Sequence, residues 1–169
     1  MFLDRRFFLI ACLVQLAGAG AGFAETPKKK LPPTPGPDAK PEEIVKTLYA
    51  SREIDSGFDF FDDTLRPRYF TQAADTLLKK VFERSEAENE PGIDYDPLID
   101  GQDGEVKGLS IVVTASGQAK STVEARFTSF EDKTVVIFDF VAEANVWKID
   151  DIRDKEGNSL KAVAKDFLQ

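Results

Sequence analysis

Apolar residues recur at helical spacing in two stretches of the N-terminal half of the chain. In the first stretch, the apolar positions are Ile44, Val45, Leu48 and Tyr49. Their spacing predicts an amphipathic helix of about three turns that begins at Pro41, because proline suits the first position of a helix. In the second stretch, the apolar pairs are Ala73 and Ala74, Leu77 and Leu78, and Val81 and Phe82. Their four-residue repeat predicts a second helix from Thr71, a suitable N-cap, to about Arg84.

From residue 108 onward the hydrophobic period changes to two. Apolar and polar residues alternate over 109–116 and 122–128, and the stretch 134–141 is apolar on both faces. A fourth short stretch covers 146–152. The turns between these segments are short, and this predicts an antiparallel meander because parallel crossovers need a dozen or more residues.

A last apolar stripe lies close to the C-terminus. Its members are Leu160, Val163, Ala164, Phe167 and Leu168. They predict a helix capped by Asn158 or Ser159. Helices before a run of strands indicate an α+β fold. We therefore expect N-terminal helices packed on a curved antiparallel meander of about four strands, followed by a C-terminal helix.

The segment 85–105 has neither period and is predicted to be a loop. It contains eight acids and no base: Glu86, Glu88, Glu90, Asp94, Asp96, Asp100, Asp103 and Glu105. Calcium prefers oxygen ligands on such loops, so the candidate metal ligands are Asp94, Asp96, Asp100 and Asp103. The EF-hand spacing fails, because a loop starting at Asp94 has Ile99 where glycine is needed and one starting at Asp96 ends at Lys107. A solvated acidic loop and a patch for a basic partner are the alternatives to a calcium site.

The first 24 residues resemble a cleaved export signal. A basic pair, Arg5 and Arg6, precedes an apolar run that ends at Leu16, and small residues follow up to Ala24. This pattern predicts a periplasmic or secreted bacterial protein with no membrane span after cleavage. The arginine pair resembles the twin-arginine motif, with the general secretory route as the alternative. Cys12 also matches the position of a lipid-modified cysteine, but the apolar run before it is short for that pathway.

The proline-rich segment 25–40 separates this export signal from the rest of the chain. Its five prolines and sparse apolar side chains predict an extended linker. The remaining residues, 41–169, suffice for one domain.

Composition removes several classes of function. The chain has no histidine, and Cys12 is its one cysteine. Ser-His-Asp and Cys-His catalysis and histidine-ligated zinc are therefore excluded. The formal net charge of −8 disfavours nucleic-acid binding, because such a surface repels phosphates. The negative charge is compatible with binding of a cationic partner, and it is equally explained by a role in keeping the protein soluble. No cofactor is predicted.

Three residues are candidates for catalysis: Asp139, Asp151 and Tyr49. A period of two places Asp139 in an apolar row of its strand and Asp151 beside Trp147 and Ile149. Apolar neighbours raise the pKa of a carboxyl group, as a general base requires, and the Tyr49 hydroxyl would act as a proton donor. The alternative is structural, with each acid paired to a base such as Arg126 or capping a turn.

The aromatic residues are expected in the core, with one exception left open. Trp147 and most phenylalanines suit a core because of the area that they bury. The run Phe58-Asp59-Phe60-Phe61-Asp62-Asp63 suits either the core or a lip over the mouth of a cavity.

Three local patterns resemble a family of small exported bacterial domains of unknown function. They are Tyr95-Asp96-Pro97-Leu98 with Gln102-Asp103, Trp147-Lys148-Ile149-Asp150-Asp151-Ile152, and Gly157-Asn158-Ser159-Leu160. The resemblance covers about residues 41–169 and implies a cystatin-like cone, as in the nuclear transport factor two superfamily. That superfamily includes isomerases, dehydratases and non-enzymatic binding domains, so the resemblance leaves the function open. The absence of histidine departs from its dehydratase pattern.

These observations favour a non-catalytic domain that binds a small ligand or a protein partner. One alternative is a carboxylate-based isomerase or hydrolase that uses Asp139 or Asp151. Another is a secreted inhibitor or immunity-type protein whose acidic loop blocks a basic site.

Overall fold

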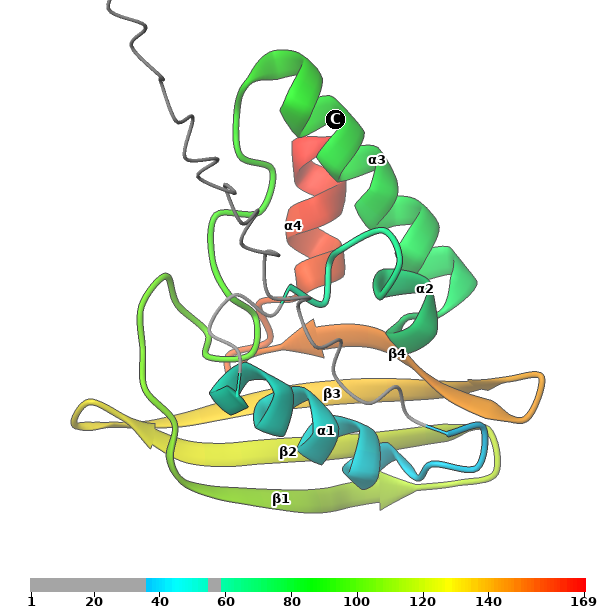
Figure 1. The fold of residues 1–169 in the computed structure, drawn as a ribbon, viewed down its shortest axis with the longest axis vertical. Helices are drawn as coiled ribbons and strands as arrows, with labels where there is room; N and C mark the ends of the chain where they lie inside the picture. The colour runs from blue at the N-terminus through cyan, green and yellow to red at the C-terminus, as the bar shows by residue number, and fades with distance from the viewer. Residues whose placement is uncertain (1–35, 55–58) are drawn as a thin grey trace, which may run out of the picture. The chain divides into compact units, whose positions relative to one another are not determined.

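A computed structural model describes residues 36–54 and 59–169 (Figure 1). The chain divides into a unit of residues 1–30 and a unit of residues 31–169, and every described residue belongs to the second unit. The predicted export signal, and the linker up to residue 35, lie outside the described residues.

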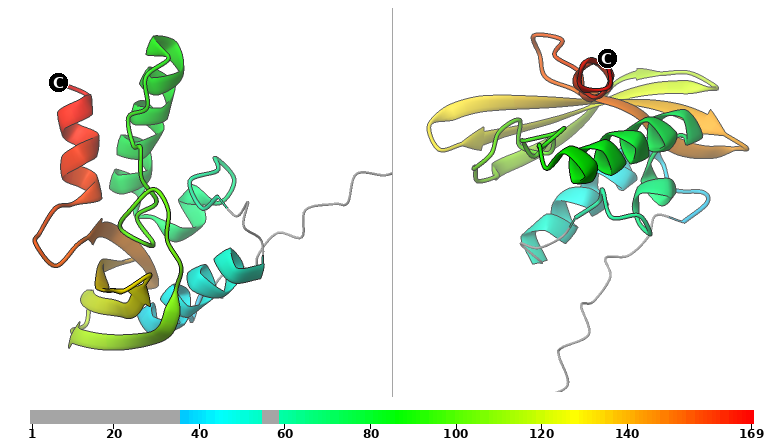
Figure 2. Two further views of the ribbon diagram at one scale, coloured as in Figure 1. Left: turned by 90° about the vertical axis from the view of Figure 1, so that its left-hand side faces the viewer. Right: turned by 90° about the horizontal axis from the view of Figure 1, so that it is seen from above.

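Four strands form one antiparallel sheet in the order β1-β2-β3-β4. They are β1 (Lys107–Ser116), β2 (Lys120–Ser129), β3 (Asp132–Glu143) and β4 (Val146–Arg153). The predicted meander is thus confirmed. The sheet is curved but not closed, with β1 and β4 as its edges (Figure 2). Ala144 and Asn145 both have positive φ, 50° and 65°, and this left-handed pair forms the tight turn between β3 and β4.

Helix α1 (Pro41–Ile54) lies across one face of the sheet (Figure 1). It begins at Pro41 as predicted, and the Glu43 carboxylate accepts a hydrogen bond of 3.0 Å from the Lys40 amide in front of it. This bond satisfies one of the amides at the helix start. The apolar stripe around Val45 and Leu48 is buried on β1 and β2, which explains the helical period of the sequence.

Helices α3 (Gln72–Glu88) and α4 (Leu160–Phe167) run side by side near the β4 edge (Figures 1 and 2). Thr71 caps α3 as predicted, because its side chain accepts the Ala74 amide. The helix continues one turn further than predicted, so the segment 85–88 is not loop. An Arg84–Glu88 ion pair of 2.9 Å and the left-handed conformation of Asn89 (φ 53°) stabilise and close this extra turn.

A short helix, α2 (Arg66–Tyr69), was not predicted. Four residues are too few for a periodic pattern, and Arg66 is buried although it is charged. Its guanidinium donates to Asp75 (2.7 Å), Asp63 (2.7 Å) and the carbonyl oxygen of Phe61 (3.0 Å). These bonds tie the segment before α2 to α3.

The face of the sheet toward the helices is buried in β2 and β3, whereas β1 has no buried residue. In β3 the residues that face the helices are Val136, Phe138 and Phe140, each at most 1% exposed. Side chains alternate along a strand, so Asp139 points to the opposite face. A β-bulge interrupts this alternation in β4, where Asp139 pairs with Asp151 but Phe140 pairs with Ile149. Asp150 is the extra residue.

This bulge corrects the predicted surroundings of Asp151. Strict alternation would place Asp151 beside Trp147 and Ile149. One inserted residue instead turns Asp151 toward the face of Asp139, and it lets Ile149 and Ile152 both reach the core.

None of the helices in the described ranges is both long enough and apolar enough to cross a bilayer.

Tyr69 provides a test of the packing. Its hydroxyl is buried without a hydrogen-bond partner in the described part of the chain. Because a buried, unpaired hydroxyl costs free energy, we expect Tyr69→Phe to raise the free energy of unfolding by about 0.5–1 kcal/mol. Urea unfolding of the two proteins measures this difference. A loss of more than about 1 kcal/mol would show that the hydroxyl is hydrogen-bonded.

Candidate functional site

Tyr49 of α1 has a structural hydrogen bond. Its hydroxyl donates to the carbonyl oxygen of Leu98 at 2.7 Å, and its ring lies edge-on to Phe127 and Phe138. Burial, and to a lesser extent the nearby Asp96, raises the pKa of Tyr49 well above its ordinary value. The hydroxyl therefore keeps its proton and fastens the loop that contains Leu98.

Asp139 lies on the other face of the sheet. Its carboxylate accepts hydrogen bonds from Arg153 Nε (2.8 Å) and from the Thr122 hydroxyl (2.9 Å). The bond to Asp139 raises the pKa of Arg153. Tyr49 contacts Phe138, the neighbour of Asp139, so strand alternation directs Asp139 away from Tyr49.

Asp151 binds the N-terminal end of α4. It accepts the Ser159 hydroxyl (2.7 Å) and the Lys161 amide (3.1 Å). A carboxylate at this end of a helix is stabilised by the free amides and the helix dipole. Asp139 and Asp151 are register partners, but each has its own hydrogen bonds, and Tyr49 lies near neither. The three catalytic candidates are not brought into one cavity.

The four candidate metal ligands are spread out. Asp96 accepts from Arg52 Nε (3.0 Å) and from the Leu98 amide (2.8 Å), Asp94 is exposed nearby, and Asp103 is exposed further along the loop. Asp100 lines a separate cavity. Over the described ranges, no three acidic side chains are grouped so that they could hold a metal ion. A calcium site stays a prediction.

The cavity beside Asp100 is small, at about 230 Å³, and its charged lining residues are Asp100, Asp154 and Arg153. Tyr95 also lines it. Burial, followed by the charges of Asp100, Asp151, Asp154 and Asp94, raises the pKa of Tyr95 to about 12. Burial and the charge of Asp154 also raise the pKa of Asp100. The Asp154 carboxylate is held by Asn158, whose backbone amide donates to it at 2.8 Å.

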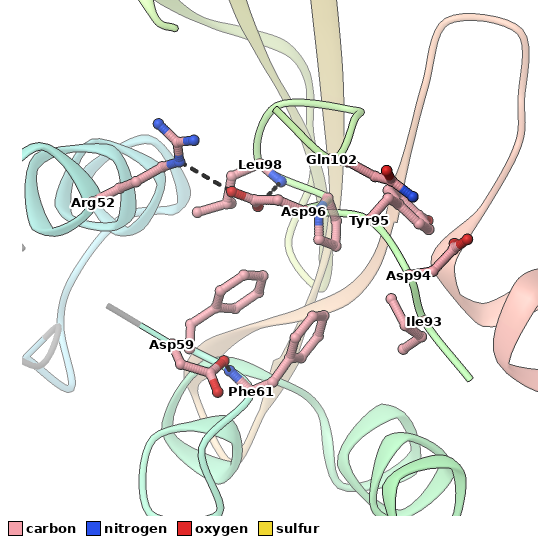
Figure 3. A pocket seen from close by; sticks show the side chains of 11 residues that line it. Arg52, Asp59, Phe61, Ile93, Asp94, Tyr95, Asp96, Leu98 and Gln102 are labelled. Atoms are coloured by element: carbon pink, nitrogen blue, oxygen red, sulfur yellow. Dashed lines mark hydrogen bonds and ion pairs between the residues drawn. The ribbon is translucent and has the colours of Figure 1, made fainter. Parts of the chain in front are cut away.

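A larger cavity of about 700 Å³ lies between the C-terminal end of α1, the segment 59–61 and the loop 93–102 (Figure 3). We call it the aromatic cavity. It is lined by Arg52, Asp59, Phe60, Phe61, Ile93, Asp94, Tyr95, Asp96, Pro97, Leu98 and Gln102.

Stacked aromatic rings form one wall of the aromatic cavity. The ring centroids of Phe60 and Phe61 are 4.5 Å apart with an angle of 24° between the planes, and Phe70 continues the stack behind them. Phe60 and Phe70 are buried, whereas Phe61 is partly exposed and its ring points into the cavity (Figure 3). In the run 58–63, Phe60 therefore belongs to the core, which is one of the two alternatives, and Phe61 lines this cavity. A lip over the mouth of the cone stays a prediction, and Phe58 itself lies outside the described residues.

The opposite wall is the loop 93–102, and α1 holds it in place. Arg52 pairs with Asp96, and the Tyr49 hydroxyl binds the carbonyl oxygen of Leu98. Within the loop, the Asp96 amide donates to the carbonyl oxygen of Gly101 at 2.8 Å. These bonds preform the wall without a ligand.

Sequence reasoning identified part of this site. Asp94 and Asp96 were metal candidates, and Tyr95 and Gln102 belong to the resembled pattern. Arg52 was missed, because its contact with Asp96 joins residues 44 positions apart and leaves no local pattern.

Comparison with known proteins adds little. No family model matches the chain, and no curated protein matches it. A solved structure from Ralstonia solanacearum, a phospholipid-binding protein in complex with a phospholipid, aligns with 72% of this chain and 69% of that chain. The identity is 14% and the TM-score is 0.32, a likeness that assigns neither a family nor a ligand to this protein.

The contribution of the hydrogen bond between Tyr49 and Leu98 to stability can be measured by comparing Tyr49→Phe with Tyr69→Phe. Tyr49→Phe removes a hydroxyl that is hydrogen-bonded and leaves a buried carbonyl oxygen without this donor. We expect it to lower the free energy of unfolding by about 1–2 kcal/mol and to speed amide exchange in residues 96–101. Tyr69→Phe makes the same chemical change at an unpaired hydroxyl and is the control. Equal effects of the two variants would contradict the proposed fastening of the loop.

Proposed function

We propose that this protein is a non-catalytic binding domain that holds a small ligand in the aromatic cavity. The observation that carries this proposal is the partly exposed ring of Phe61, which faces a fixed, polar-rimmed loop across a cavity of about 700 Å³. Cavities of roughly 300–1,000 Å³ with apolar walls and a few polar groups are typical sites for small molecules.

The two walls have different roles in this proposal. The stacked rings supply apolar area, which gives affinity when water is displaced from it. The carboxylates of Asp59 and Asp94 and the Gln102 amide also line the cavity and would orient the ligand. Both walls are fixed by internal hydrogen bonds, so binding would require little ordering of the chain.

Binding is supported over catalysis by the partners of the acids. A general base must lie within reach of a substrate. Asp139 instead holds Arg153 and Thr122, and Asp151 caps α4. Neither lines the aromatic cavity.

A neutral aromatic probe tests the proposal. We expect naphthylethanol to bind with a dissociation constant of about 1 mM or tighter, given the binding energy of a ligand of its size. Two-dimensional NMR should show shift changes in residues 59–61 and 93–98. Phe61→Ala should weaken binding at least about fivefold, because it removes the exposed ring of the wall.

Phe130→Ala is the matched control. Phe130 is 63% exposed at the turn between β2 and β3, outside the cavity, so its loss should leave binding unchanged. A second variant, Phe61→Leu, removes the ring but keeps an apolar side chain. It tests the role of the ring if Phe61→Ala fails to fold. Shift changes located elsewhere, or unchanged affinity in both Phe61 variants, would reject the proposal.

We also propose that the protein is exported to the bacterial periplasm. Residues 1–24 support this with their basic start, apolar middle and small-residue end. Arg5→Lys combined with Arg6→Lys should stop export by the twin-arginine route, whereas Lys29→Arg should not. Cell fractionation, with the mass of the exported form, measures both. Unchanged export of the double variant would favour the general secretory route.

A further inference from the structure

We propose that the aromatic cavity selects an organic cation with an apolar body. This inference rests on the proposed function and adds the chemical class of the ligand. It is argued from the charges that line the cavity, from how those charges are already used, and from the position of the Phe61 ring.

Three carboxylates and one guanidinium line the cavity. The guanidinium is already used, because Arg52 donates from Nε to Asp96 at 3.0 Å and from Nη2 to the carbonyl oxygen of Gly104 at 3.5 Å. Asp96 also accepts the Leu98 amide. Arg52 and Asp96 therefore neutralise each other, and neither charge is left to bind a ligand.

The remaining charges are the carboxylates of Asp59 and Asp94. Within 36–54 and 59–169, neither carboxylate forms an ion pair with a lysine or an arginine. Asp59 accepts the Phe61 amide with Oδ1 at 2.8 Å, and this bond holds the carboxylate at the backbone of Phe61. In Figure 3, Asp59 lies beside Phe61, whereas Asp94 lies on the loop across the cavity and its carboxylate is directed away from the Phe61 ring.

The ring adds to the same preference. The face of an aromatic ring is negative, so it attracts a cation that lies within about 6 Å of its centroid. A cationic ligand against Phe61 would meet the ring and the Asp59 carboxylate, in a cavity whose two remaining lining charges are both negative. An anionic ligand would be repelled by these charges, and a neutral ligand would gain the apolar contact alone.

Three probes with one aromatic body and different charges test the inference on the purified protein. They are naphthylethylammonium, naphthylethanol and naphthylpropanoate. At low salt we expect the ammonium compound to bind about tenfold more tightly than the alcohol (about 1.4 kcal/mol) and the carboxylate to bind more weakly than the alcohol. The advantage of the ammonium compound should fall as salt screens the exposed carboxylates.

Substitutions of the two aspartates test whether they cause the preference for the ammonium compound. Asp94→Asn and Asp59→Asn should each reduce the preference for ammonium over alcohol to about threefold and leave alcohol binding nearly unchanged. Asp132→Asn changes the net charge equally at a strand end outside the cavity, so it should retain the full preference.

The outcomes separate the two proposals. If the alcohol binds at residues 59–61 and 93–98 but the ammonium compound binds no more tightly, the cation inference fails and the binding site stands. If none of the three probes binds there, the proposed function fails as well. An equal loss of preference in Asp132→Asn would show an effect of net charge alone and would also overturn the inference.

Discussion

The aromatic cavity depends on one buried charge, the guanidinium of Arg66. This side chain is 3% exposed, and removing such an ion from water costs several kcal/mol unless partners surround it. Asp63, Asp75 and the carbonyl oxygen of Phe61 supply those partners, and the ring of Phe82 lies 5.7 Å from the guanidinium carbon. The segment before α2 must therefore stay against α3. Since one of the bonds goes to the backbone of Phe61, the same charge fixes the ring that walls the cavity.

The facing wall is fixed in a different way, through α1. This helix is anchored by its apolar stripe on the sheet, and its C-terminal half presents the buried Tyr49 and the partly exposed Arg52 to the loop 93–104. The cavity is thus made of loops, but each loop is bonded to a helix that belongs to the core. Binding sites on loops held by a rigid scaffold are common, because loops tolerate varied side chains while the scaffold keeps them in position.

The sequence predicted those parts of the fold whose burial repeats along the chain. Helices α1, α3 and α4 and the first two strands were found from their periods, whereas β3 was found as a run that is apolar on both faces and β4 as a short segment after a turn. The last turn of α3 was missed because Ser85, Glu86 and Glu88 are polar and Ala87 is exposed, and α2 was missed because it is short. One feature of the sequence reflects the bulge at Asp150: Ile149 and Ile152 are both buried although they are three positions apart, which strict alternation would not allow. The aromatic cavity was predicted only in pieces, since its walls meet through contacts between distant residues.

The bulge in β4 also gives the acids of this strand a structural role. It places two adjacent carboxylates at the sheet edge near the first residues of α3 and α4. Asp150 accepts the hydroxyl of Thr71, the N-cap of α3, at 3.1 Å and the Lys161 ammonium of α4 at 3.0 Å. Asp151 binds the first turn of α4 through Ser159 and the Lys161 amide. The two acids thus attach α3 and α4 to the sheet edge.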